Sequence, residues 1–150
     1  MAKKKSFSSR KNPYDWSKNG SLWKQLLDLI QPTAERAKPE GAQISRERWD
    51  APELKMEWSS SDDIGRAIQI LISPARKKMK LVVNGSAWKD SSQERRWKTE
   101  GLMTIPIPPD LRKLDLSTLY QELNESKEIV SAWTEIDLDR ADPLPCRSCN

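Results

Sequence analysis

Apolar positions along the chain follow two different periods, one typical of helices and one typical of strands. Between Ser21 and Pro32 they recur at three- and four-residue spacing, which predicts a short amphipathic helix that begins after Ser21 and ends or kinks at Pro32. This stripe is typical of core packing. Residues 31–52 hold three prolines and Gly41, so we expect a connector there.

From Leu54 onward the period is two, which predicts antiparallel strands. Leu54–Ser59 alternates, whereas Ala67–Ile72 is apolar on both faces, so we expect that second strand in the middle of the sheet and covered on each side. The next run, from Met79, reaches Asn84-Gly85, where two interpretations stay open: a hairpin turn, or a bulge within one strand. A last strand is predicted at Arg95–Ile107.

A second helical period follows the prolines that end this strand. Asp115 or Ser117 is the expected N-cap, and the apolar stripe runs from Leu116 to Trp133. We expect this helix to pack across the sheet. The predicted fold class is therefore α+β: an antiparallel sheet of four or five strands, a C-terminal amphipathic helix packed on it, and a short N-terminal helix.

Length and charge divide the chain into three predicted parts. With 150 residues and 36% hydrophobic content, the chain matches one ordinary domain with a modest core. We expect a basic flexible arm at residues 1–20, a single α+β domain at 21–133, and an acidic, proline-containing tail at 134–150. No apolar run approaches the ~20 residues of a membrane span, so we expect a cytoplasmic protein without membrane contact.

The sequence lacks the residue types of common catalytic and metal sites. It has no histidine, which excludes Ser-His-Asp and Cys-His mechanisms, and no glycine-rich phosphate-binding motif. Cys146 and Cys149 form a single C-x-x-C, whereas structural zinc needs four ligands, so we expect a reduced tail there. We therefore expect neither an enzyme nor a protein with a cofactor or a bound metal.

A basic stretch with tryptophans in it is the strongest candidate for a binding site. From Arg76 to Lys98 the chain holds eight basic residues and two acidic ones. Single-stranded nucleic acids are held by cations that contact phosphates and by aromatic rings on which bases stack. The candidate nucleic-acid-binding residues are Arg76, Lys77, Lys78, Lys80, Trp88, Lys89, Arg95, Arg96 and Lys98.

Strand alternation divides this stretch between two faces of the sheet. We expect Lys80, Arg96 and Lys98 to project from one side and Trp97 from the other. Trp88 joins the side of Lys80 only if the chain keeps its register at residues 84 and 85. A lysine-rich face also has a structural explanation, because it blocks pairing at sheet edges.

The order of elements from Leu54 to Trp133, antiparallel strands followed by one long amphipathic helix, resembles the PC4 and Whirly superfamily of single-stranded DNA-binding transcription regulators. The resemblance implies a curved sheet whose basic and aromatic side chains bind single strands, often in a dimer or a larger assembly. We therefore expect a protein that binds single-stranded DNA or RNA, as a regulator of transcription or DNA metabolism and as a homo-oligomer. The alternative is a non-catalytic protein-interaction subunit of a larger complex, which has a protein partner.

Overall fold

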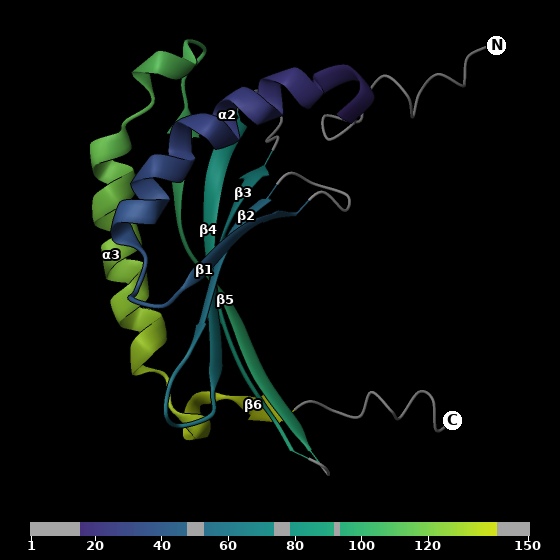
Figure 1. The fold of residues 1–150 in the computed structure, drawn as a ribbon, viewed down its shortest axis with the longest axis vertical. Helices are drawn as coiled ribbons and strands as arrows, with labels where there is room; N and C mark the ends of the chain where they lie inside the picture. Colours follow the sequence, from purple (N-terminus) through teal and green to yellow (C-terminus); the bar gives the residue numbers. More distant parts are fainter. Residues whose placement is uncertain (1–15, 48–52, 74–78, 92–93, 141–150) are drawn as a thin grey trace, which may run out of the picture.

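Two helices lie on one face of an antiparallel sheet in the computed structural model, which describes residues 16–47, 53–73, 79–91 and 94–140 (Figure 1). The sheet order follows the chain, β1-β2-β3-β4-β5-β6, and every neighbouring pair is antiparallel. The strands are β1 (Gln43–Glu47), β2 (Glu53–Ser59), β3 (Gly65–Ser73), β4 (Met79–Asp90), β5 (Arg95–Ile107) and β6 (Asp139–Arg140). The helices are α2 (Trp16–Ala37) and α3 (Leu116–Ala132), with 3-10 turns η1 (Leu111–Lys113) and η2 (Glu135–Asp137). The α+β fold class is thus confirmed.

Helix α2 is longer at both ends than the sequence pattern predicts. It begins at Trp16 and continues through Pro32 to Ala37, so of the two outcomes expected at the proline, an end or a kink, the end is wrong. A proline inside a helix costs about 3 kcal/mol. The turn that follows offsets this cost because it buries Ala34 and Ala37 completely. In addition, the Lys127 ammonium of α3 donates to the Ala37 carbonyl at 3.0 Å and thereby satisfies one end of the helix.

Two strands were not predicted. β1 lies in the segment that was expected to be a connector, and β6 lies in the predicted tail. β1 contains one apolar residue, Ile44, so its sequence shows no alternation. β6 is only two residues long and pairs with Arg96 and Trp97 of β5. The remaining parts of the predicted arm and tail, residues 1–15 and 141–150, lie outside the described residues.

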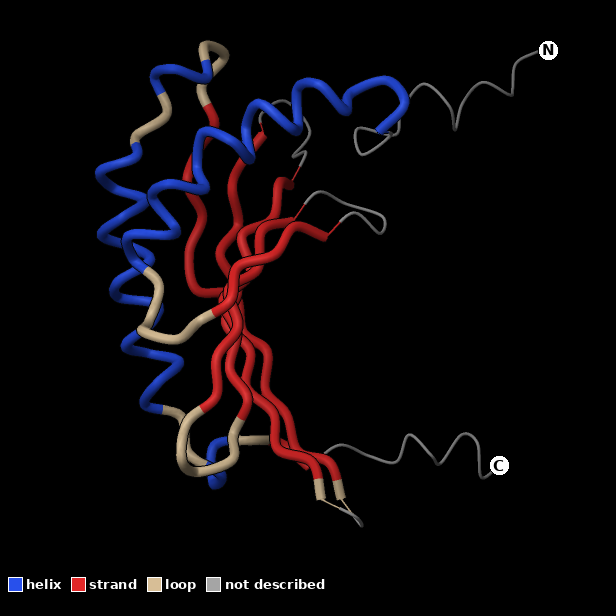
Figure 2. The backbone as a smooth tube through the Cα atoms, in the orientation of Figure 1, coloured by secondary structure: helices blue, strands red, loops and turns tan. Residues whose placement is uncertain are grey.

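The core lies between the helices and the sheet face that they cover (Figure 2). Its largest fully buried side chains include Leu26, Leu27, Ile30, Ile68, Ile70, Ile72, Leu81, Leu119 and Leu123. On the other face of β3, Gln69 and Leu71 are only half-buried, and no element among the described residues covers them. The expectation that β3 is covered on both sides is therefore wrong for the described residues. Both described helices pack on the face that carries the three isoleucines.

Strand β4 runs without a break through Asn84 and Gly85, so the hairpin interpretation is wrong. Gly85 faces α3: a Cβ atom there would lie 2.5 Å from the Cγ2 of Val130, so the glycine lets the helix approach the strand. The irregularity lies in β5 instead. Val83 pairs with residue 103 and Asn84 with residue 101, which leaves Leu102 as the extra residue of a bulge.

Buried Arg66 joins the end of α3 to the turn between β2 and β3. Its side chain is 3% exposed and donates to the carbonyls of Val130, at 3.1 Å, and Trp133, at 2.6 Å. The same guanidinium pairs with the Asp62 carboxylate at 3.0 Å. At the other end of α3, the predicted cap Asp115 is confirmed, since its carboxylate accepts from the Thr118 N–H at 2.9 Å. The Arg66 contacts hold the C-terminal end of α3 against the sheet.

Candidate functional site

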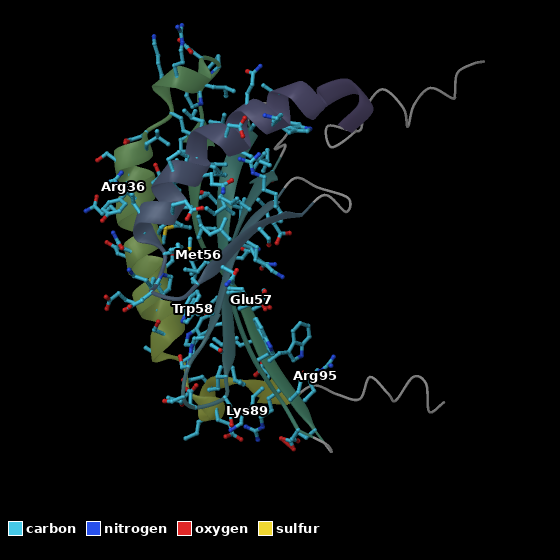
Figure 3. The ribbon with its side chains drawn as sticks, in the orientation of Figure 1. Arg36, Met56, Glu57, Trp58, Lys89 and Arg95 are labelled. Carbon is cyan, nitrogen blue, oxygen red and sulfur yellow. The ribbon has the colours of Figure 1, made fainter. Side chains whose placement is uncertain are left out.

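The sheet face turned away from the helices carries a groove over β2 to β5. Its volume of about 890 Å³ falls within the roughly 300–1,000 Å³ of typical ligand sites. Figure 3 shows Glu57 and Arg95 on this side of the sheet, whereas Met56 and Trp58 project toward the helices. We call this side the open face, and the side chains that line its groove include Lys55, Gln69, Ser86, Trp88, Asp90, Arg95, Trp97 and Thr99.

Trp88 and Trp97 are direct cross-strand partners on the open face. Directly opposite residues of an antiparallel pair share a face, so the prediction that Trp97 projects from the side opposite Lys80 and Trp88 is wrong. The bulge at Leu102 is the reason, because one extra residue in β5 moves every side chain before it to the other face. The prediction that an unbroken β4 puts Trp88 on the side of Lys80 is confirmed.

The two indole rings differ in their exposure. Trp97 is 52% exposed, while Trp88 is half-buried. Gly65 lies opposite Trp88 in the neighbouring strand, and a Cβ atom at Gly65 would overlap the indole ring. The missing side chain of Gly65 therefore gives the Trp88 ring room to lie over β3. The result is a pair of adjacent aromatic surfaces in the groove.

Three of the predicted phosphate-binding cations lie on the opposite side of the sheet. Lys89 lies there because it follows Trp88 directly in β4, whereas the bulge in β5 places Arg96 and Lys98 there. Lys89 pairs with Arg96 across the strands, and Lys98 pairs with buried Ala87. The expectation that Arg96 and Lys98 share a side with Lys80 is therefore wrong. We call Lys89, Arg96 and Lys98 the basic cluster.

Each cation of the basic cluster contacts an acid. The Lys89 ammonium lies 3.1 Å from the Glu135 carboxylate, and the Lys98 ammonium lies 3.6 Å from that of Glu100 and 5.1 Å from the centroid of the Trp133 ring. The Arg96 guanidinium donates to Glu94 at 2.6 Å. This hydrogen bond raises the pKa of Arg96 above its ordinary value.

Charges on the open face itself are nearly balanced. Arg95 pairs with Asp90 at 2.9 Å, and Lys55 lies 3.7 Å from Glu57. Lys80 shares the face and has no ion-pair partner among the described residues. The open face thus has aromatic surface and scattered cations but no marked positive excess.

A row of hydrogen-bonding side chains crosses the strands beside the tryptophans. The Gln69 amide donates to Glu53 at 3.1 Å, and the Ser86 hydroxyl donates to the Gln69 carbonyl oxygen at 3.3 Å. The hydroxyl oxygens of Ser86 and Thr99 lie 3.3 Å apart. Lys55, Gln69, Ser86 and Thr99 were all missing from the sequence-predicted site, because their proximity depends on the strand register. The only sequence signal for them is the polar half of each strand alternation.

Three predicted site residues, Arg76, Lys77 and Lys78, lie outside the described residues. Within the described part of the chain, no group of three His, Cys, Asp or Glu side chains has the arrangement of a metal site. No helix among the described residues has the length and apolar character needed to span a bilayer.

A scan against protein-family models and searches of curated proteins and of solved structures found no match to this chain. The resemblance to the PC4 and Whirly superfamily therefore stays a prediction from the order of elements.

Proposed function

We propose that this protein binds single-stranded nucleic acid on the open face, with Trp88 and Trp97 as the surface on which bases stack. The observation that carries this proposal is that the two rings are cross-strand neighbours in a groove, and that one of them is half-exposed. Each base stacked on an aromatic side chain contributes about 1 to 3 kcal/mol. Adjacent rings on an ordered sheet would hold such bases without further ordering of the protein.

The groups around the tryptophans favour a single strand over a duplex. Bases in a duplex stack on one another, so their faces are not free to stack on protein rings, whereas unpaired bases offer both faces and edges. Gln69, Ser86 and Thr99 provide donors and acceptors for base edges. Arg95 is 62% exposed and borders the groove, where it can contact a phosphate.

A protein partner is the second candidate, and the charge balance of the open face favours it. Interface hot spots are enriched in tryptophan and arginine, and both line this groove. Paired charges at the rim, such as Arg95 with Asp90, are also typical of protein interfaces. This candidate predicts that the tryptophans are buried by a protein and not by bases.

The direct test of the proposed function is a titration of tryptophan fluorescence with oligothymidylate and with a duplex, each at low and high salt. We expect the single strand to bind more tightly, with an affinity that falls as salt rises. Trp97→Ala should weaken binding by about 1 to 3 kcal/mol, which is the value of one stacked base. Gly65→Ala should also weaken it, because the new Cβ displaces the Trp88 ring while the net charge is unchanged.

A matched control is Ile129→Ala, which removes an apolar side chain that is 41% exposed on α3. Its affinity for oligothymidylate should equal that of the wild type. If the wild type does not bind the single strand even at low salt, or if Trp97→Ala binds as well as the wild type, the proposed function is wrong and the protein-partner candidate takes its place.

A further inference from the structure

The open face carries fewer unpaired positive charges than we expect for a protein that binds a polyanion. Of the cations described on this face, Lys55 and Arg95 have acidic partners, and Lys80 is the one without an ion-pair partner among the described residues. Binding of nucleic acids depends strongly on cations that replace the counterions of phosphates. The basic cluster lies at the end of the same β4–β5 hairpin: the Lys89–Arg96 pair is the cross-strand row next to Trp88–Trp97. The two rows project from opposite faces of the hairpin.

Glu135 differs from the other acids that contact the basic cluster. Glu94 and Glu100 are each two residues along the chain from their partners, whereas Glu135 is 46 residues from Lys89 and comes from the segment after α3. Its backbone carbonyl also accepts from the Arg96 guanidinium at 3.1 Å. Glu135 thus brings both a carboxylate and a carbonyl oxygen to two cations from outside the hairpin.

Other contacts hold this segment in place without the Glu135 carboxylate. Leu138 is 4% exposed and belongs to the core. The Asp137 carboxylate accepts from the Thr134 N–H at 2.7 Å, and β6 pairs with β5 immediately afterwards. The Glu135 side chain itself is 53% exposed. Exchange of its carboxylate for another anion therefore requires a side-chain rotation and no unfolding of the segment.

We propose that the basic cluster is a second site for phosphate groups, and that the Glu135 carboxylate occupies the position of a phosphate in the free protein. The identity of the natural ligand rests on the proposed function: a single strand whose bases stack on the tryptophans reaches Lys89, Arg96 and Lys98 where it passes over the end of the hairpin. Phosphate oxygens suit this site because guanidinium and ammonium groups both donate to them. Glu135 thereby lowers the affinity for the strand in a graded, electrostatic way.

The experiment compares full-length wild type with Glu135→Gln, which keeps the size of the side chain and removes its charge. Glu128→Gln is the matched control, because it makes the same charge change at an exposed residue of α3. The probes are oligothymidylate and inorganic tripolyphosphate, the second of which has phosphates but no bases. Glu135→Gln should bind tripolyphosphate about two- to fivefold more tightly than the wild type, the range expected for loss of one exposed ion pair.

Two further outcomes follow from the same site. Adding Lys89→Gln to Glu135→Gln should abolish the gain in affinity for tripolyphosphate. Glu135→Gln should also steepen the salt dependence of oligothymidylate binding, because a cation released from its ion pair can replace more counterions. Equal affinity of wild type, Glu135→Gln and Glu128→Gln for tripolyphosphate would overturn the inference. Because tripolyphosphate has no bases, this result is independent of the tryptophans. A failure of oligothymidylate alone to bind would instead count against the proposed function.

Discussion

At the scale of single residues, Arg66 and its partners show how a buried charge is stabilised in this fold. Its guanidinium contacts the Asp62 carboxylate and two carbonyl oxygens at the end of α3, of Val130 and Trp133. A buried charge is tolerated only when it is paired and hydrogen-bonded, and here both conditions are met. The residue alternation of β3 gives no sign of this role, because the arginine stands at an apolar position of the strand pattern.

The ion pair of Arg66 predicts a specific dependence of stability on pH. The hydrogen bond from Arg66 lowers the pKa of the Asp62 carboxyl below its ordinary 3.8. A carboxyl with a lowered folded-state pKa stabilises the fold above its unfolded-state pKa, and this contribution is lost as the pH falls through the folded-state value. The wild type should therefore lose stability on acidification below about pH 4 more steeply than Asp62→Asn does.

Urea denaturation at a series of acidic pH values measures this difference. The neighbouring Asp63 has an exposed side chain outside the ion pair, so Asp63→Asn should keep the acid slope of the wild type. If the slope of Asp62→Asn equals that of the wild type, Asp62 does not contribute to the pH dependence in the way that the structure indicates.

At the scale of elements, the sequence pattern predicted those segments whose periodicity is long and regular. The bounds of β5 and the cap of α3 at Asp115 are confirmed because prolines at the end of a strand and an N-cap residue before an apolar stripe are strong local signals. β1 and β6 were missed because a short polar strand is formed by its partner and not by its own residues. The end of α2 was predicted wrongly at Pro32 for a similar reason, because burial of the following turn offsets the free-energy cost of a proline inside the helix.

The same reasoning explains why the candidate site was only partly predicted. The sequence placed Trp88 on the side of Lys80 only on condition that β4 keeps its register, and β4 does keep it. Relative to Lys80, Trp97, Arg96 and Lys98 were assigned to the wrong sides. The bulge at Leu102 decides this, and nothing in the local sequence marks Leu102 as an extra residue. The shift of one residue in the register of β5 therefore places the tryptophans on one face of the sheet and the basic cluster on the other.

The close approach of α3 to β4 gives a prediction at this scale. Gly85→Ala would place a Cβ atom 2.5 Å from Val130 and force the helix away from the strand. We expect a loss of about 1 to 3 kcal/mol in the free energy of unfolding, which is typical of overpacking in a core. Urea denaturation measures it.

Gly101 of β5 is the matched control for this substitution. A Cβ atom there would meet only the Asn84 side chain, at an ordinary 3.5 Å. Gly101→Ala should therefore leave the stability almost unchanged. Equal effects of the two substitutions would mean that the packing of α3 on β4 is not tight at Gly85.

At the scale of the whole molecule, the fold separates stability from the proposed binding. Both described helices pack on one face of the sheet (Figure 1). They bury the isoleucines of β3, while the other face keeps a groove with two tryptophans. Trp97 is largely outside the core, whereas Trp23 is 2% exposed and belongs to the core. Ligands on the open face should thus change the environment of some tryptophans and leave others as they are.

The most direct test of the account is to follow the indole N–H signals of the seven tryptophans by NMR while oligothymidylate is added. Substitution of single tryptophans assigns the signals. We predict that the signals of Trp88 and Trp97 shift together as the oligonucleotide binds, while that of buried Trp23 stays unchanged. Binding of the oligonucleotide with no shift at Trp88 and Trp97 would contradict the account.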